Sequence, residues 1–171
     1  MEEISRLIKQ AGVRDILQIL EQEANTTPAQ IAERTGLSKR KVTRLVRALE
    51  AAGVIRKYKA VINWERAGAE RVYAFIEVRV TPERGRGFDA VAERILRFPE
   101  VHSLYLMSGA YDLHVVAEGT NMREVALFVA EKLATIEGVR STATHFVLRR
   151  YKVDGDLLEQ PDRAERLPVS M

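Results

Sequence analysis

The apolar residues in the first sixty positions recur with the period of an α-helix. The clearest stripe has members at i, i+3, i+4 and i+7, namely Val42, Leu45, Val46 and Leu49. Residues 13–20 show the same period, and residues 3–10 form a shorter leading segment. With a further segment between them, the pattern predicts four helices, the last of which runs from Ser38 to Gly53.

The third and fourth of these helices have the spacing of a helix-turn-helix. Thr27 is the predicted N-cap of the third helix, with Pro28 at its first position and Gln30 completing a capping box. This helix ends at Gly36, so only a short turn precedes Ser38, which caps the fourth helix. In DNA-binding proteins with this motif, the second helix enters the major groove.

After Gly53 the helical period is lost, and residues 54–62 predict two short strands. This segment also carries Arg56, Lys57 and Lys59. A basic hairpin directly after a recognition helix is the wing of a winged helix, and wings contact the phosphate backbone. Residues 1–64 are therefore predicted to form a winged helix-turn-helix domain that binds DNA.

From residue 71 the pattern becomes that of a sheet with two helices. Apolar and polar residues alternate strictly from Arg71 to Thr81, which predicts a strand. The other elements follow in order: a helix over 88–96, strands over 101–107 and 111–118, a helix from Asn121 to Gly138, and a strand over 139–151. The second helix is expected to bury Val125, Ala126, Val129 and Leu133.

The order βαββαβ predicts an α+β protein, with a ferredoxin-like domain over residues 71–152. Residues 65–70 are the expected hinge between the two domains. Residues 153–171 form a tail without an apolar stripe, which we expect to extend over a neighbouring subunit or to be loosely ordered.

The sheet face opposite the helices is too apolar to remain in water. Tyr73 and Phe75 point to this face from the first strand, and Tyr105 and Met107 from the second. We therefore expect a second copy of the chain to cover this face and form a two-fold symmetric dimer. Such a dimer presents two recognition helices to a near-palindromic DNA site.

Charge is distributed unevenly along the chain. Residues 1–60 hold 12 basic and 7 acidic side chains, whereas residues 61–171 hold 15 and 17. The stretch from Ser38 to Lys59 alone has eight cations and one acid. Three of these cations stand in the first helical turn, where positive charge is unfavourable. Such a surface suits an external polyanion such as double-stranded DNA.

Composition excludes several other classes of protein. The absence of cysteine excludes disulfides and thiolate metal sites. No apolar run approaches the roughly 18 residues of a membrane helix, and the N-terminus MEEISRLIKQ is too charged for a secretory signal. We therefore expect a cytoplasmic protein with no membrane partner and no cofactor.

The same motifs resemble the Lrp/AsnC family, the feast/famine regulators of prokaryotes. The matching stretches are Ile31–Ser38, Leu49–Ile55, the trio Tyr58, Ala60 and Asn63, and a G-x-x-D turn at Gly109–Asp112. Lys57 stands where the family usually has a glycine in its wing. The resemblance covers residues 13–150. It implies a transcriptional regulator with a small-molecule-sensing domain that assembles into dimers and larger even-numbered rings.

Two sets of site residues are predicted. Those expected to bind DNA are Thr27, Ser38, Lys39, Arg40, Lys41, Thr43, Arg44, Arg47, Arg56, Lys57 and Lys59. The resemblance also implies an amino-acid effector at the turn between the second and third strands. The expected effector residues are Gly109, Ala110, Tyr111, Asp112, Ser141, Thr142 and Thr144. Asp112 could accept hydrogen bonds from an ammonium group or could bind only backbone amides.

An enzymatic function is the weaker alternative. None of the three histidines has the spacing of a metal-binding motif, and neither a phosphate-binding loop nor a nucleophile elbow is present. His114 and His145 fall on strands of one sheet and could approach Asp112, which leaves an acid–base or metal site open. Two other readings share the two-domain plan: a sirohaem-decarboxylase-like enzyme and an amino-acid-sensing subunit that does not bind DNA.

Overall fold

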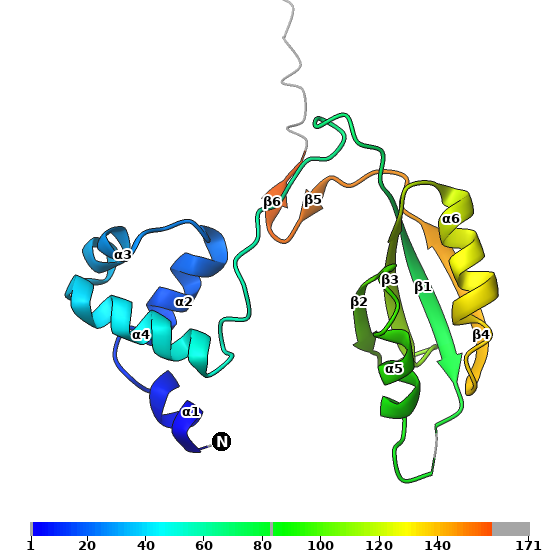
Figure 1. The fold of residues 1–171 in the computed structure, drawn as a ribbon, viewed down its shortest axis with the longest axis horizontal. Helices are drawn as coiled ribbons and strands as arrows, with labels where there is room; N and C mark the ends of the chain where they lie inside the picture. The colour runs from blue at the N-terminus through cyan, green and yellow to red at the C-terminus, as the bar shows by residue number, and fades with distance from the viewer. Residues whose placement is uncertain (1, 83, 159–171) are drawn as a thin grey trace, which may run out of the picture. The chain divides into compact units, whose positions relative to one another are not determined.

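The computed structural model describes residues 2–82 and 84–158. It divides the chain into two compact units, residues 1–61 and residues 62–171, each with a hydrophobic core of its own (Figure 1). The predicted tail beyond residue 158 lies outside the described residues. Residues 65–70, predicted as the hinge, fall within the second unit and form part of a turn in which the Ala69 amide donates to the Trp64 carbonyl at 2.9 Å.

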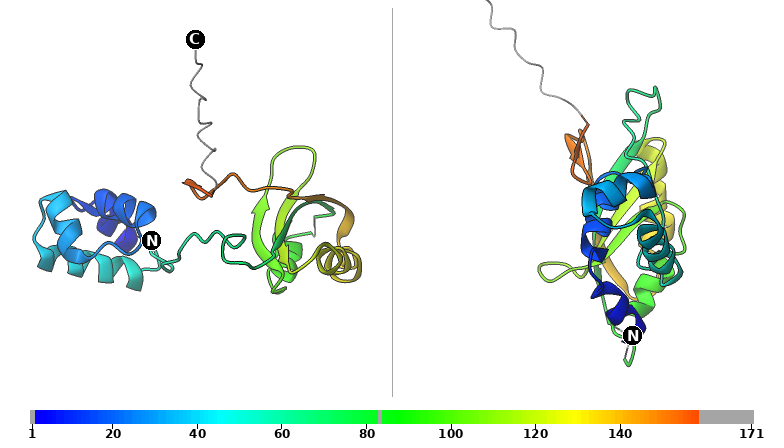
Figure 2. Two further views of the ribbon diagram at one scale, coloured as in Figure 1. Left: turned by 90° about the horizontal axis from the view of Figure 1, so that it is seen from above. Right: turned by 90° about the vertical axis from the view of Figure 1, so that its left-hand side faces the viewer.

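The first unit consists of the four predicted helices, which pack around one core (Figure 2). They are α1 (Glu2–Ile8), α2 (Val13–Gln22), α3 (Pro28–Thr35) and α4 (Lys39–Ala51). The core side chains are at most 1 % exposed: Val13, Ile16, Ile31, Val42, Leu45 and Leu49. All of them except Ile31 belong to the predicted stripes, so the helical period alone identified most of the interior.

Helix α4 ends in a Schellman motif at Gly53, which has a φ of 69°. The Gly53 amide donates to the Glu50 carbonyl, and the Val54 amide donates to the Leu49 carbonyl. A left-handed conformation of this kind favours glycine, as the sequence predicted.

The prediction of two strands over residues 54–62 was wrong, because the structure has no strand there. The amides of Val54 and Ile55 both bond to the Leu49 carbonyl at the end of α4, so they do not pair across a hairpin. A two-stranded hairpin without a third strand is marginal in water. The basic segment after α4 therefore has an irregular conformation.

The second unit contains the predicted βαββαβ order, and its four strands form one antiparallel sheet in the order β2-β3-β1-β4. The elements are β1 (Val72–Val80), α5 (Asp89–Ile95), β2 (Val101–Leu106), β3 (Leu113–Gly119), α6 (Met122–Leu127) with its π-helical extension η1 (Phe128–Leu133), and β4 (Val139–Phe146). β1 lies in the centre and pairs with β3 on one side and β4 on the other. This is the ferredoxin-like topology.

Helices α5 and α6 cover one face of this sheet (Figure 1). Beneath them lie the alternate residues of β1, such as Ile76 and Val78, which are fully buried. Ala126 is exposed, contrary to prediction, because it points about 100° away from its buried neighbour Val125. Phe128 occupies the core position instead.

Strand β4 ends at Phe146, five residues before the predicted end. Phe146 pairs with Ala74, and the Val147 amide makes one more bond, to the Tyr73 carbonyl. Because β1 begins at Val72, the residues after Val147 have almost no strand left to pair with. A small hairpin of β5 (Lys152–Val153) and β6 (Asp156–Leu157) follows.

The opposite face of the sheet, called the open face from here on, has no helix over it. Phe75 is 44 % exposed and Tyr105 is 53 % exposed, while Tyr73 is half-buried. This arrangement confirms the predicted alternation along β1. It leaves an aromatic surface in contact with water in the single chain.

Candidate nucleic-acid interface and effector site

The basic surface of the first unit begins at the N-terminus of α4. The Ser38 hydroxyl accepts a hydrogen bond from the Lys41 amide at 3.3 Å, so Ser38 is the N-cap, as predicted. Val42, Leu45 and Leu49 hold the opposite side of the helix in the core. The buried stripe therefore fixes which side chains of α4 face outward.

The seven predicted DNA-binding residues from the start of α4 line one hollow of the surface: Ser38, Lys39, Arg40, Lys41, Thr43, Arg44 and Arg47. Five of them are cationic. Among residues 2–82 and 84–158, no acidic side chain forms an ion pair with any of these five. The described residues thus leave the unfavourable charge at the helix N-terminus uncompensated, which suits a site for phosphate.

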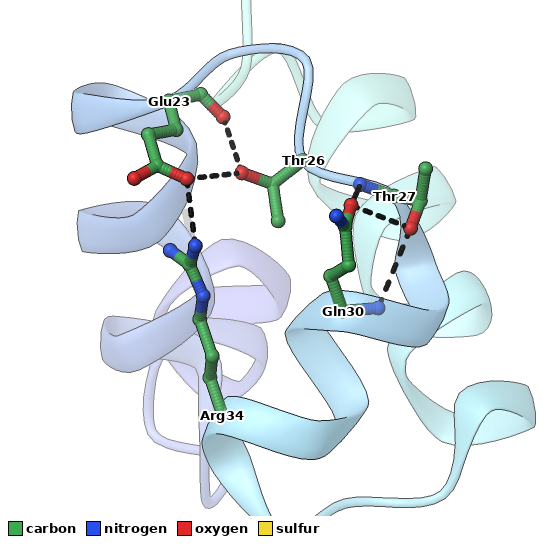
Figure 3. A network of polar contacts seen from close by, with 5 residues as sticks. All are labelled: Glu23, Thr26, Thr27, Gln30 and Arg34. Atoms are coloured by element: carbon green, nitrogen blue, oxygen red, sulfur yellow. Dashed lines mark hydrogen bonds and ion pairs between the residues drawn. The ribbon is translucent and has the colours of Figure 1, made fainter.

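Thr27 lies at the start of α3 and has a clear structural role (Figure 3). Its amide donates to the Gln30 Oε1 at 2.9 Å, and its hydroxyl accepts from the Gln30 amide at 3.4 Å. The capping box predicted from sequence is therefore present. A contact between Thr27 and DNA stays a prediction.

A second polar network joins the end of α2 to α3 (Figure 3). Arg34 donates to the Glu23 carboxylate at 2.8 Å, and Thr26 donates to the Glu23 carbonyl at 2.8 Å. The hydrogen bond from Arg34 holds the pKa of Glu23 below its ordinary value. Sequence reasoning missed this network, because its partners are 11 positions apart.

The remaining predicted DNA-binding residues, Arg56, Lys57 and Lys59, are exposed on the segment after Gly53. Between them the Tyr58 hydroxyl donates to the Glu50 carboxylate at 2.9 Å. Because Glu50 belongs to α4, this bond ties the basic segment to that helix. From the sequence, Tyr58 was identified only as one of the residues that resemble the Lrp/AsnC family, and no contact was predicted for it.

The predicted effector turn lies between β2 and β3 and projects from the sheet (Figure 2). The Asp112 carboxylate accepts a hydrogen bond from the Val80 amide at 2.8 Å, and its own amide donates to the Val78 carbonyl. One carboxylate oxygen thus completes the backbone pairing where the register of β1 and β4 shifts. Asp112 serves the backbone in the single chain, which was the alternative role considered above.

The other effector candidates are divided between two faces of β4. Ser141 lies opposite Arg79 and is exposed, whereas Thr142 and Thr144 lie opposite Val78 and Ile76 and are half-buried. This follows from the two-residue period of a strand. Ser141 and Asp112 share one end of the sheet with β1 between them, so the single chain does not gather the whole predicted set.

His114, one of the candidates for an acid–base or metal site, lies among aromatic side chains. His114 lies beside Tyr111, whose hydroxyl is 3.3 Å from its Nδ1, and its ring is 5.4 Å from that of Phe75. In the part of the chain that the structure describes, no three histidine, aspartate or glutamate side chains come close enough to hold a metal ion.

Comparison with known proteins decides the family. The model of the Lrp/AsnC ligand-binding domain matches residues 73–157, and a model of a winged helix-turn-helix DNA-binding domain matches residues 13–56. The chain belongs to the Lrp/AsnC family of transcriptional regulators. The regulator is thus a DNA-binding protein with a ligand-binding domain, and not an enzyme of the sirohaem-decarboxylase type or a subunit that lacks DNA binding.

Individual relatives agree with this assignment. The regulator is 48 % identical to an uncharacterised helix-turn-helix transcriptional regulator of Bacillus subtilis, over 91 % of this chain and 95 % of the relative. It is 33 % identical to the leucine-responsive regulatory protein of Rhizobium meliloti, over 80 % of this chain and 87 % of the relative. A Neisseria meningitidis regulator solved in complex with L-methionine superposes with a TM-score of 0.66 at 28 % identity, over 85 % of this chain and 92 % of that one.

Proposed function

We propose that the regulator reads DNA with the outer face of α4 and changes its DNA binding in response to an amino acid. The observation that carries the DNA part is the hollow of five cations that no acidic side chain of the described residues neutralises. Arg40, Arg44 and Arg47 are exposed on this surface and have the geometry for bidentate contacts to guanine. We assign contacts with the phosphates of the DNA backbone to Arg56, Lys57 and Lys59.

The first test is a salt-dependent titration of the protein with its own upstream DNA, using random DNA as the control. Tight binding to the upstream fragment that weakens steeply with salt is expected, because each phosphate contact releases a counterion. Equal binding to both DNAs would contradict sequence-specific reading.

Arg44→Ala is expected to weaken binding to the specific site by about 1–3 kcal/mol if Arg44 reads a base. If Arg44 contacts phosphate, the loss is similar on all sequences and the slope of affinity against salt becomes smaller. Fluorescence anisotropy on specific and random duplexes distinguishes the two cases. The control is Arg14→Ala, an exposed arginine of α2 in the same unit. Unchanged affinity for both duplexes would remove Arg44 from the interface.

The effector part rests on the Lrp/AsnC ligand-binding domain and on the relative that was solved with L-methionine. We assign an amino-acid site to the end of the sheet that holds the turn Gly109–Asp112 and Ser141. Thr142 and Thr144 face the helices, so we assign them to packing in their own chain.

Asp112→Asn is expected to abolish the effect of amino acids on DNA affinity and to leave affinity without effector within about twofold of the original. The asparagine keeps an oxygen acceptor for the Val80 amide but removes the charge that an ammonium group requires. A panel of amino acids is titrated into the protein–DNA complex, with the exposed Asp156→Asn as the control variant. A full response in the Asp112 variant would exclude the carboxylate from effector binding.

Assembly is part of the same proposal. Phe75 and Tyr105 are large aromatic side chains exposed on the open face, and this supports a dimer in which a second copy covers them. We further propose that dimers join into larger even-numbered assemblies. No helix of the described residues is long and apolar enough to cross a membrane. Because its target is DNA, we place the regulator in the cytoplasm.

A further inference from the structure

All three histidines of the chain lie on the open face of the sheet. On β4, His145 pairs with Phe75 across the strands. On β3, His114 contacts the same phenylalanine and lies 6.4 Å from the ring of Tyr105. On β2, the ring of His102 stands edge-on to Tyr73 at 6.2 Å. Histidine is the side chain whose ordinary ionisation falls between pH 5 and 8.

The other charged groups of this face are few and nearly balanced. Glu77 lies 3.5 Å from the Nε2 of His145 and pairs across the strands with His114. Glu118 binds Arg71 and lies 3.6 Å from the Nδ1 of His102. Arg79 lies further along β1, and the Arg150 guanidinium lies 4.2 Å from the centre of the Tyr73 ring.

Counting these groups gives the charge of the face. Three arginines and two glutamates leave +1 when the histidines are neutral, and three protonated histidines raise this to +4. With neutral histidines, a two-fold axis can set the glutamates of one copy against the arginines of the other. This balanced mixture of acids, bases and aromatic rings complements a second copy of itself better than a partner of one charge.

We propose that association of two copies through the open face is proton-linked, so that the dimer is strong near pH 7.5 and weakens toward pH 5.5. The inference rests on the proposed dimer and adds its regulation. In a dimer the face meets its own copy, so each protonated histidine adds like charge to both sides of one interface. Burying a histidinium without an acid of its own is also unfavourable. His114 is the most affected, because aromatic rings surround it and its strand neighbour Glu77 already faces His145.

The test is sedimentation velocity of the full-length regulator over a range of concentrations at pH 7.5, 6.5 and 5.5, at constant ionic strength. We expect the dissociation constant of the dimer to rise at least about tenfold between pH 7.5 and 5.5, since like charges facing each other across an interface are costly. Circular dichroism at each pH confirms that the dissociated chain remains folded. The variant His102→Gln/His114→Gln/His145→Gln is expected to dimerise with little dependence on pH.

Phe75→Glu separates failure of the inference from failure of the proposed dimer. If this variant is monomeric while the dimer of the original protein has the same strength at all three pH values, the dimer holds and the proton linkage is overturned. If Phe75→Glu remains dimeric, or the original protein is monomeric throughout, the open face is not the interface and both proposals fail.

A second measurement needs no folded triple variant. The unmodified dimer is diluted rapidly into weakly buffered solution at pH 6.5 that contains an indicator dye. Dissociation is expected to take up protons, more than one for each dimer. Dissociation without proton uptake would overturn the inference, and the single variant His114→Gln is expected to reduce the uptake.

Discussion

Replacing Leu45 with alanine is expected to destabilise the first unit by about 3 kcal/mol, within the range of 2–5 kcal/mol for truncating a buried leucine. Leu45 is 1 % exposed and stands in the middle of the buried stripe of α4, among five other core side chains. A unit of about 60 residues buries little surface and has only a few kcal/mol of stability. The variant should therefore unfold this unit over much of the physiological temperature range.

The second unit should be unaffected, because its core contains none of the residues of the first. Thermal unfolding followed by circular dichroism is expected to show an early transition for the Leu45→Ala variant, together with loss of DNA binding above that temperature. Dimerisation should persist through this transition. The control is Leu127→Ala, since Leu127 is 43 % exposed on α6. A single transition that shifts as a whole in the Leu45 variant would mean that the two units do not unfold separately, and no shift at all would contradict the predicted destabilisation.

Replacing Phe75 with glutamate is expected to weaken the dimer more than a hundredfold. The substitution places an unpaired charge in each half of the proposed interface, and an unpaired buried charge costs about 3–5 kcal/mol. Glu77 lies two residues away on the same face, so the new carboxylate also faces a like charge. Because Phe75 is already 44 % exposed in one chain, the monomer should fold normally.

Analytical ultracentrifugation measures this loss, and Leu127→Glu is a matched control. Leu127 has nearly the same exposure, at 43 %, but belongs to α6 on the helix-covered side of the sheet. DNA with two half-sites should bind the Phe75 variant much more weakly than the control, because a monomer engages the half-sites one at a time. A Phe75 variant that dimerises as well as Leu127→Glu would place the interface elsewhere.

Sequence alone predicted those parts of the fold that depend on local chemistry. The caps at Thr27 and Ser38 and the stop at Gly53 involve neighbours within five residues, so their geometry follows from residue type. The burial of alternate residues in β1 follows in the same way from the two-residue period. Where a short-range rule was sufficient, prediction and structure agree.

Predictions failed where an element depends on distant partners. Residues 54–62 have strand-forming side chains but no third strand to pair with, and β4 stops because its antiparallel partner β1 begins only at Val72. The role of Asp112 also depends on a distant group, since its carboxylate bonds to the amide of Val80, 32 positions away. The sequence showed that the turn contains an acid. It did not show that this acid accepts a hydrogen bond from the last residue of the central strand β1.

All three histidines belong to the second unit, so the first unit contains no histidine. Between about pH 5.5 and 7 its contacts with DNA should therefore keep a constant strength, since histidine is the side chain that ordinarily ionises there. If acid reduces operator occupancy in the cell, the loss should therefore come from the dimer, and it should disappear in the variant His102→Gln/His114→Gln/His145→Gln. The division of the chain into two units thus confines the effect of a change of pH to assembly and spares the contacts with DNA.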